Sequence, residues 1–465
     1  MTNVPDHDTI LQFADSLRGT VLTAADADYD EMRGVFNEMI DRRPLVIVRC
    51  AGAADVIRAV EFARTNELPL AVRSGGHGVT GSSVCDDGVV IDLRPMKGMR
   101  IDPEARTARV EPGLTWGELN DDLQHFGLGA TGGYISITGI PGLTLGGGLG
   151  WLIRKHGLAL DNLLSVDVVT ADGRLVTADE TQNADLFWGV RGGGGNFGVV
   201  TSLEFRVHPV GTVLAGLVIH PLEQAKEVLR AFREHVPTVP DELTWGVLLL
   251  RIPASPPFPP PLHGAPVAAF AICYAGSIEE GEKVLAPIRA FGPPMADVVE
   301  PMPYSAAQVA ADIVWPPGRH NYWKSSFLRE LSDDAIDLVV DRFAEAPSPG
   351  TVMVLDHNGG GAIDRVGPDE TAFGHRGWTY NCLLTAQWSD PADSELNIAW
   401  TRSFWEEMQP FLADAVYVNY TSDIGEEMLD LAYPAGIRDR LVALKTKYDP
   451  TNLFRLNQNI RPADG

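Results

Sequence analysis

Three glycine clusters lie within the first 200 residues of this 465-residue chain, and each borders a predicted strand. They occupy residues 74–78, residues 129–150 and residues 189–200. Glycine loses more conformational freedom on folding than any other residue, so such clusters need a physical reason. In a loop beside a strand, bare backbone lets peptide N–H groups approach a ligand and bind phosphate oxygens. Three such loops in one region predict a site for a dinucleotide that carries a pyrophosphate group.

Two other interpretations of the glycines remain open. The first is a nicotinamide-binding Rossmann domain, although the segment 146–150 lacks the GxGxxG spacing and no clear strand precedes it. The second is that the glycines only form turns, which would explain one cluster but explains three poorly. The P-loop, HExxH and GxSxG motifs are absent from the sequence.

The first 100 residues show alternating strand and helix patterns. Residues 45–50 are predicted to form a buried strand, residues 56–63 have apolar positions at helical spacing, and residues 69–73 are apolar again. Strand, helix and strand over so short a span indicate a βαβ unit. The second strand runs directly into the first glycine cluster.

The chain changes character near Pro209. Because a single hydrophobic core stops growing at roughly 250–300 residues, a chain of this length is expected to form two domains. The tail returns to a helix that ends at Asp449-Pro450 and has an apolar face formed by Ile437, Leu441 and Leu444. Between these regions, apolar strands are predicted at 213–219, 245–251 and 267–274, and amphipathic helices at 222–235, 277–291 and 332–345.

Composition excludes several classes of partner. The net charge is −25, whereas duplex nucleic acid and anionic membranes need a basic protein face, so neither is expected. The four cysteines lie far apart without a CxxC pair, so no metal site is expected. Residues 1–30 lack a signal-peptide pattern and no apolar run reaches about 18 residues, which favours a cytoplasmic location.

Several motifs occur in the order found in one family of flavoproteins. The chain resembles the berberine bridge enzyme-like FAD-linked oxidoreductases of the vanillyl-alcohol oxidase superfamily, and it is similar to their bacterial members of the 6-hydroxynicotine oxidase type. The resemblance covers nearly the whole chain. It rests on PLAVRSGGHG (69–78), GLTLGGGLGWL (142–152), GLALDNL (157–163), DLFWGVRGGGGNFGVVTSLEF (185–205) and YDPTNLFRLNQNI (448–460).

The resemblance implies an α+β fold with two domains. Both ends of the chain, residues 1–208 and 413–465, would form the FAD-binding domain. Residues 209–412 would form an α+β substrate-binding domain with an antiparallel sheet. These limits agree with the change of character near Pro209 and with the helical tail.

The resemblance also implies that His77 carries the flavin. In the family, the histidine of the RSGGH motif is joined to the 8α-methyl group of the flavin ring, and a neutral imidazole nitrogen is nucleophilic. Many relatives form a second link through a cysteine, whose position is Ile135 here. Isoleucine cannot form that bond, so we expect a single covalent link. Thr138 stands where many relatives have a valine linked to oxygen access.

Further cofactor contacts are expected from the same motifs. Amide side chains such as those of Asn457 and Asn459 can bond both donor and acceptor positions at a flavin edge. The expected FAD-binding residues are Arg73, Ser74, Gly75, Gly76, His77, Gly78, Ser82, Thr138, Gly142, Gly147, Gly148, Gly150, Asp161, Asn162, Gly198, Val199, Asn419, Asn457 and Asn459.

The Tyr417-Val418-Asn419-Tyr420 segment supplies the candidate catalytic residues, because it matches a family motif near the flavin. A base should remove the hydroxyl or amine proton when hydride leaves the substrate carbon. If the segment is a strand, Tyr417 and Asn419 share one face and Tyr420 lies on the other. We therefore expect Tyr417 to face the flavin, with simple packing as the alternative for either tyrosine.

The expected function is an FAD-dependent oxidase. It would transfer hydride from a C–H bond next to a hydroxyl or amine of a small organic substrate to flavin N5, with O2 as acceptor. A flavin dehydrogenase or oxidative cyclase with another acceptor, and a non-catalytic flavin-binding protein, are the alternatives. We expect a monomer or homodimer. Candidate substrate-binding residues on predicted central strands are Tyr322, Trp323, Lys324, Tyr380 and Gln387.

Overall fold

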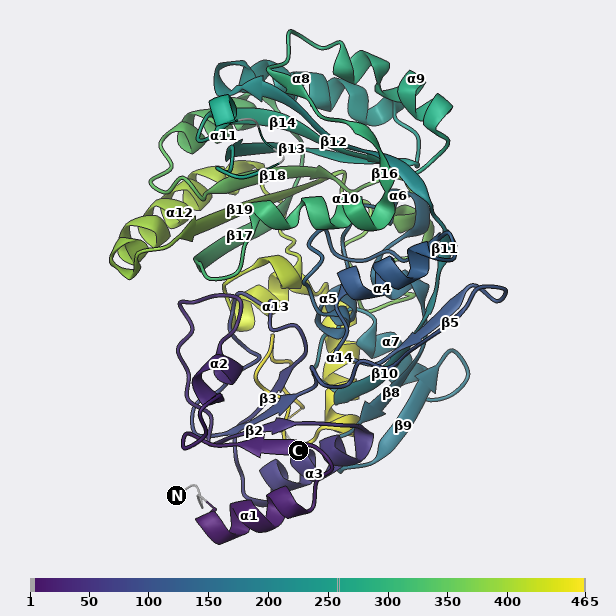
Figure 1. The fold of residues 1–465 in the computed structure, drawn as a ribbon, viewed down its shortest axis with the longest axis vertical. Helices are drawn as coiled ribbons and strands as arrows, with labels where there is room; N and C mark the ends of the chain where they lie inside the picture. The colour runs from purple at the N-terminus through teal and green to yellow at the C-terminus, as the bar shows by residue number, and fades with distance from the viewer. Residues whose placement is uncertain (1–4, 257, 259, 464–465) are drawn as a thin grey trace.

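The computed structural model describes residues 5–463 apart from residues 257 and 259, and it consists of two halves (Figure 1). Both ends of the chain lie in one half, which we call the terminal half. The middle of the chain forms the other, which we call the central half, around an antiparallel sheet. The expected α+β fold of two domains, with an antiparallel sheet in the middle of the chain, is confirmed.

The first sheet of the terminal half has four strands in the order β1–β2–β4–β3. Strands β2, β4 and β3 are parallel, and β4 lies between the other two. The predicted βαβ unit is therefore present, but its two strands pair with β4 and not with each other. The elements are β1 (Thr20–Leu22), β2 (Val46–Arg49), α3 (Ala53–Thr65), β3 (Leu70–Arg73) and β4 (Val89–Asp92).

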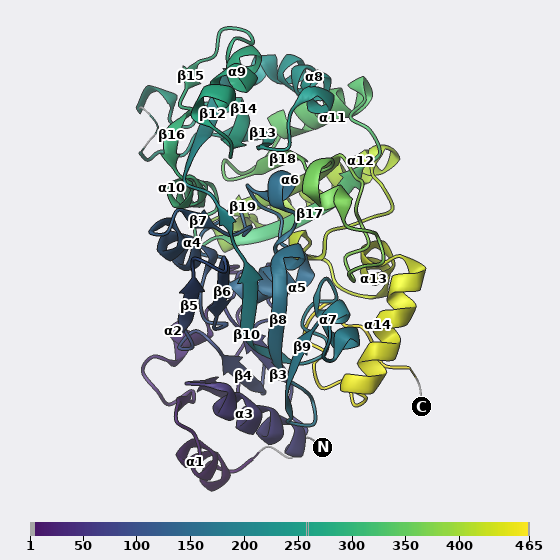
Figure 2. The same cartoon turned by 90° about the vertical axis from the view of Figure 1, so that its right-hand side faces the viewer.

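A second sheet in this half has five antiparallel strands in the order β5–β6–β10–β8–β9. The C-terminal helix α14 (Ala435–Tyr448) returns to it, and Figure 2 shows α14 beside α7 (Ala184–Val190). Ile437, Leu441 and Leu444 are buried in the core of this half, which confirms the predicted apolar face. The strands are β5 (Met99–Asp102), β6 (Thr107–Val110), β8 (Leu163–Val169), β9 (Leu175–Asp179) and β10 (Val199–Arg206).

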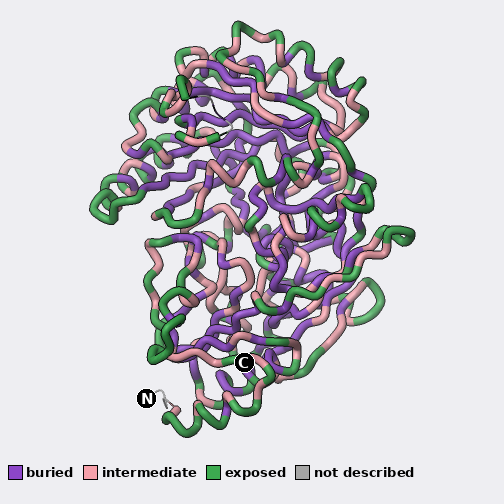
Figure 3. The backbone as a smooth tube through the Cα atoms, in the orientation of Figure 1, coloured by how far each residue is buried: buried purple, intermediate pink, exposed green. Residues whose placement is uncertain are grey.

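The central half is built on an eight-stranded antiparallel sheet in the order β15–β12–β14–β13–β18–β19–β17, with β16 also pairing with β12. Helices cover its outer face, and Figure 3 shows that most of its strands are buried. The other face lies toward the terminal half. The strands are β12 (Thr212–Pro221), β13 (Leu243–Arg251), β14 (Pro266–Tyr274), β15 (Ala296–Asp297), β16 (Glu300–Pro303), β17 (His320–Leu328), β18 (Val352–His357) and β19 (Tyr380–Trp388).

The three helices predicted for the central half are present as α8 (Ala225–His235), α9 (Ile278–Arg289) and α11 (Asp333–Ala344). Within the described residues, no helix has both the length and the apolar character needed to cross a lipid bilayer. The remaining elements are α1 (His7–Asp15), α2 (Tyr29–Arg33), α4 (Trp116–Gln124), β7 (Leu128–Gly129), α5 (Ile140–Gly146), α6 (Ile153–His156), β11 (His208–Pro209), α10 (Tyr304–Ala310), α12 (Ser394–Met408), α13 (Glu426–Ala432) and several short 3₁₀ helices.

A buried ion pair ties the tail to the third glycine cluster. Lys445 on α14 and Asp449 are both fully buried, and their Nζ–Oδ2 distance is 2.8 Å. Lys445 Nζ also donates to the carbonyl oxygens of Asn196 at 2.9 Å and Phe454 at 2.8 Å. Asp449 accepts hydrogen bonds from the backbone N–H groups of Leu453 and Phe454 at 2.8 Å. All three ammonium protons are thereby used, and the tail is fixed beside the glycine loop.

We expect Lys445→Met to lower the free energy of unfolding by about 3–5 kcal/mol, because Asp449 would remain buried without its partner charge. Lys447→Met on the same helix is the matched control, since Lys447 pairs with Asp185 on an exposed surface and should contribute less than about 1 kcal/mol. Urea denaturation of both variants measures the difference. Equal stability of the two variants would contradict the role assigned to Lys445.

Candidate functional site

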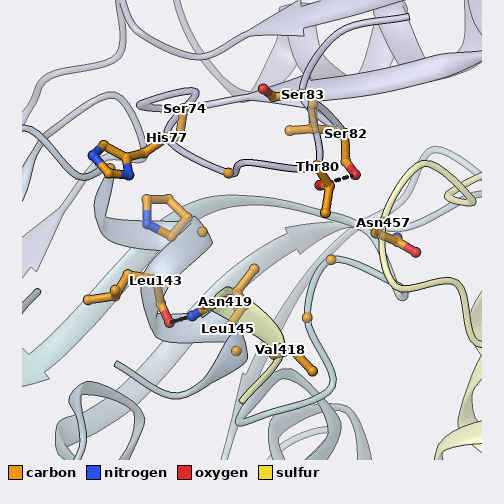
Figure 4. Close-up of a pocket in the computed structure, with 18 of the residues that line it drawn as sticks. Ser74, His77, Thr80, Ser82, Ser83, Leu143, Leu145, Val418, Asn419 and Asn457 are labelled. Carbon is orange, nitrogen blue, oxygen red and sulfur yellow. Dashed lines mark hydrogen bonds between the residues drawn. The ribbon is translucent and has the colours of Figure 1, made fainter. Parts of the chain in front are cut away.

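A cavity of about 330 Å³ lies in the terminal half next to strand β17 of the central sheet. All three glycine clusters line it, together with residues 418–421 and 456–458. Figure 4 shows Ser74 and His77 on one side of the cavity and Leu143 and Asn419 on the other. Segments far apart in the sequence therefore converge on one site.

Many residues expected from the sequence line this cavity. Sequence reasoning did not single out Tyr134, Asn196, Tyr433 and Gln458, which line it as well. Asn196 could have been found, because it ends the run of glycines in the third cluster. The expected residues in the wall are Ser74, Gly75, Gly76, His77, Gly78, Ser82, Thr138, Gly142, Gly198, Val199, Asn419, Tyr420, Asn457 and, from the central sheet, Trp323.

The glycines of the wall serve two different purposes. Gly75 and Gly139 pack backbone against backbone, because a Cβ at either position would lie 2.4–2.5 Å from the peptide nitrogen of the other. A Cβ on Gly142 or Gly195 would instead meet no atom within 4 Å, although both residues line the cavity. The first pair brings two loops together, and the second pair leaves bare backbone facing open space.

The imidazole of His77 lies between two aromatic side chains. It stacks on Phe36 with ring centroids 3.9 Å apart and meets the Trp323 ring edge-on at 6.4 Å. Its Nε2 atom is buried and has no hydrogen-bond partner among the described residues. Burial lowers the pKa of His77 to about 4, so the ring is neutral at pH 7 and keeps a nucleophilic nitrogen.

The tyrosine motif does not form the predicted strand. Val418–Tyr420 is a short 3₁₀ helix (η9), so the expected alternation of faces is wrong. Tyr420 lines the cavity, whereas Tyr417 is fully buried behind it with the two rings 4.8 Å apart. The Tyr417 hydroxyl accepts hydrogen bonds from Gly148 N and Asn419 Nδ2, both at 2.8 Å. Asn419 also donates to the carbonyl oxygen of Leu143 at 3.0 Å (Figure 4).

Asp356 on β18 is a buried carboxyl that sequence reasoning missed. Burial raises its pKa to about 7. Burial also raises the pKa values of Tyr134 and Tyr420, and the negative charge of Asp356 raises them further. Asn381 lies opposite Asp356 in the β18–β19 pairing, and its side-chain amide offsets part of the rise in the pKa of Asp356. The available signal was an acid directly after the apolar run of residues 352–355.

Four of the expected substrate-binding residues lie away from the cavity. Tyr380 is on the helix-covered face of the sheet, 5.9 Å from the ring of Phe232. Tyr322 donates to Asp423 at 3.1 Å and Lys324 forms an ion pair with the same carboxylate. Gln387 donates to the backbone carbonyls of Val314 and Gly350.

Several expected cofactor-binding residues form a layer behind the cavity wall. Asp161 forms a bidentate ion pair with Arg376 of the central half at 2.6 and 3.0 Å, and both side chains are buried. Asn162 bonds the carbonyls of His156 and Leu158, and the Arg73 guanidinium bonds the carbonyl of Met32. Gly147 packs against Tyr417, Gly148 against Ala159 and Gly150 against Gly132. Asn459 comes directly after Gln458, which lines the cavity.

The unpaired polar atoms of the wall fit the FAD that the sequence predicts. Besides His77 Nε2, the side-chain oxygens of Asn457 and Gln458 are buried without a partner among the described residues. A flavin offers ring N–H and carbonyl groups at its edge, and its pyrophosphate suits the exposed glycine backbone. Within the described part of the chain, no group of three or more His, Cys, Asp or Glu side chains could hold a metal ion.

Comparison with known proteins agrees with this fit. Residues 44–179 match the family model of an FAD binding domain, and residues 416–461 match the family model described as berberine and berberine like. An FAD-linked oxidoreductase of Dictyostelium discoideum is 32% identical, over 97% of this chain and 96% of its own. The (R)-6-hydroxynicotine oxidase of Paenarthrobacter nicotinovorans is 30% identical, over 96% of this chain and 97% of its own.

Solved structures share the whole fold. The crystal structure of 6-hydroxy-D-nicotine oxidase from Arthrobacter nicotinovorans superposes with a TM-score of 0.87 and 28% identity, covering 96% of this chain and 98% of that one. The BBE-like 1 protein of Physcomitrella patens gives a TM-score of 0.88 at 24% identity, covering 98% and 100% of the two chains. At that identity the second likeness concerns the fold alone.

We expect Gly142→Ala to weaken FAD binding about tenfold or more, because its methyl group would project into the cavity. The variant should fold at least as stably as the parent, since alanine favours a helix over glycine by about 1 kcal/mol. FAD titration in a His77→Ala background, where the flavin is exchangeable, measures the affinity. Gly436→Ala is the control, because Gly436 is also helical with open space at Cβ but is exposed outside the cavity. Equal FAD affinity of the two variants would contradict the assignment of Gly142 to the FAD-binding wall.

Proposed function

Because this chain belongs to the berberine bridge enzyme-like family of FAD-linked oxidoreductases, we propose that it is an FAD-dependent oxidase. A C–H bond beside a hydroxyl or amine of a small organic substrate gives its hydride to flavin N5, and O2 accepts the electrons. The observation that carries the proposal is the cavity wall, where bare glycine backbone, an unpaired imidazole nitrogen and unpaired amide oxygens surround one space. The relative from Paenarthrobacter is itself named an oxidase.

In this proposal His77 holds the FAD through one covalent bond. The neutral imidazole lines the cavity, and Ile135 lines the same cavity without a thiol for a second link. Cys85 does not replace the missing cysteine, because it is buried, its Sγ atom lies 3.7 Å from the carbonyl oxygen of Val89, and burial raises its pKa to about 12. A protonated, buried thiol is a poor nucleophile.

Asp356 and Tyr420 are proposed to handle the substrate proton. Bound FAD supplies the two-electron acceptor, so the chain must supply the proton acceptor. A carboxyl with a pKa of about 7 exchanges a proton readily at neutral pH. Tyr420 lines the cavity and its pKa responds to the Asp356 charge, so its hydroxyl is the proposed contact between substrate and carboxyl. Tyr417 is proposed to hold Gly148 and Asn419 behind the reacting groups.

A dehydrogenase or oxidative cyclase is the second candidate function. Thr138, which replaces the valine of many relatives, lines the cavity, and its hydroxyl changes the polarity of the wall that O2 must pass. A non-catalytic flavin-binding protein is a third possibility. It is disfavoured because Tyr420 lines the cavity, and the charge of the buried acid Asp356 raises the pKa of Tyr420.

We expect the purified protein to stay yellow after acid precipitation, because the His77 bond survives unfolding. Mass spectrometry should find one FAD on a peptide that contains His77, and His77→Ala should release all of its flavin. After anaerobic reduction by a substrate from an alcohol and amine panel, exposure to air should restore the oxidised spectrum within the turnover time.

Each failure has a separate meaning. A colourless protein that does not take up FAD would contradict the cofactor proposal. Flavin that remains attached in His77→Ala would contradict the linkage. Slow reoxidation in air would favour the dehydrogenase, and failure of every substrate to reduce the flavin would favour the non-catalytic protein.

We expect kcat/KM to rise with pH through about 7, because Asp356 must lose its proton before it can accept one. Asp356→Asn should remove this limb, and both Asp356→Asn and Tyr420→Phe should lower kcat/KM by about 100-fold or more. Asp356→Asn should also raise the melting temperature at pH 8, since a carboxyl whose folded pKa is raised destabilises the fold once it ionises. Stopped-flow reduction across pH and thermal unfolding measure both effects.

Tyr304→Phe is the control for loss of a buried tyrosine hydroxyl. Tyr304 packs in the core beside α4, and its hydroxyl contacts the carbonyl oxygen of Ala130 at 3.4 Å. Its kcat/KM should stay near that of the parent. An unchanged pH profile in Asp356→Asn would remove Asp356 from the proposed proton path.

A further inference from the structure

The imidazole ring of His77 stacks on the side chain of Phe36. The two rings are nearly parallel, with an interplanar angle of 18° and centroids 3.9 Å apart, and Phe36 is only 7% exposed. Trp323 completes the group, with its ring centroid 6.2 Å from Phe36 and 6.4 Å from His77 and its plane at 76° and 64° to theirs. One face of the imidazole is therefore covered by Phe36.

Gly76 and Gly78, which flank His77, have no side chains that could orient the imidazole ring. Gly76 precedes His77 in the left-handed region with φ of 66°, and a Cβ on Gly78 would meet no atom within 4 Å. The backbone of the loop is fixed at Gly75, but a histidine side chain still has several rotamers about χ1 and χ2. The stacking contact with Phe36 comes from outside the loop and adds a constraint on the ring that the glycines do not supply.

Asn37 fixes the segment that carries Phe36. Its Nδ2 atom donates to the carbonyl oxygens of Val79 at 2.8 Å and Asn321 at 3.0 Å, and its Oδ1 atom accepts from Asn321 N at 2.9 Å. The backbone N–H of Phe36 donates to the Gly76 carbonyl at 3.0 Å. Asn37 is 2% exposed. The segment is thus bonded to the chain on both sides of His77 and also to strand β17.

We propose that Phe36 and Asn37 are positioning residues for covalent attachment of the flavin. Asn37 anchors Phe36 between the His77 loop and β17, and Phe36 stacks on one face of the imidazole, which limits the orientations that the ring can take at the cavity. This inference rests on the proposed function, because it needs FAD in the cavity and a bond at His77. It concerns the rate of attachment and not the affinity for FAD.

The atoms and electrons of the attachment step balance when O2, the electron acceptor proposed above, takes up the two electrons. An imidazole nitrogen forms a bond to the 8α carbon, one C–H bond of that carbon breaks, and the imidazole loses its N–H proton. The two electrons from this step reduce the flavin and then pass with two protons to O2, which gives hydrogen peroxide. A nitrogen held in line with the reacting carbon accelerates such a step, and a freely rotating ring does not.

The test compares four variants expressed with limiting riboflavin and then mixed with FAD. We expect Phe36→Leu to attach flavin about tenfold more slowly or worse, because leucine fills the space without a stacking face. Phe36→Tyr should restore the parent rate. Asn37→Ala should slow attachment as Phe36→Leu does. Phe13→Leu is the matched control, since Phe13 is 8% exposed and stacks on Phe62 at 4.1 Å far from the cavity.

Flavin fluorescence of the denatured polypeptide on a gel, followed over time, gives the attachment rate. FAD titration of Phe36→Leu combined with His77→Ala gives the affinity without attachment, and it should stay within about twofold of His77→Ala alone. This split supports positioning, because a general structural defect would weaken both quantities. Far-ultraviolet circular dichroism confirms that each variant is folded.

The proposal is overturned if Phe36→Leu attaches flavin as fast as Phe13→Leu, or if its loss of FAD affinity accounts for the slower rate. A parent protein with no acid-stable flavin, or a His77→Ala protein that keeps it, overturns the proposal through its premise. These outcomes differ, because the first two leave the parent linked through His77.

Discussion

The contact between Gly75 and Gly139 fixes the position of the first glycine loop. Their backbones approach so closely that a Cβ on either residue would lie within 2.5 Å of the other peptide nitrogen. The Ile140 N–H, next in the chain, donates to the Leu114 carbonyl at 3.1 Å and anchors the start of α5. His77, two residues beyond Gly75, is therefore held at a fixed distance from Gly142 on α5. The two sides of the cavity depend on this one approach of bare backbone.

Several buried polar atoms at the cavity have no hydrogen-bond partner among the described residues. A buried donor or acceptor without a partner costs about 1–3 kcal/mol, and His77, Asn457 and Gln458 each place one at the cavity. The surrounding structure holds them there, since Lys445 fixes the tail and Gly75 fixes the loop. A ligand that bonds these atoms recovers the cost, which is a physical reason for such groups to gather at a binding site.

Local sequence signals predicted the elements, and long-range contacts decided which side chains reach the cavity. The predictions of the βαβ unit and of the helical tail depend on residues close together in sequence, and both are confirmed. The glycine clusters were recognised in the same way, and all three line the cavity. Asp161 matched a motif, yet Arg376 occupies its carboxylate from 215 residues away. The assumed strand at 417–420 gave the two tyrosines the wrong faces, because the segment is a 3₁₀ helix. Asp356 had no motif, and only the pairing of β18 brings it near Tyr420.

The proposed chemistry needs groups from both halves, so the halves must be held in register. His77 belongs to the terminal half, whereas Asp356 belongs to the central sheet. Polar contacts cross between the halves at several places, among them Asn37 with Asn321, Asp161 with Arg376, and Ser136 with Asp312. A hydride acceptor and a proton acceptor that serve one substrate tolerate errors of only about 1 Å. Contacts at separate places along the interface resist a hinge motion between the halves. The active geometry is therefore a property of the interface between the halves as much as of either half.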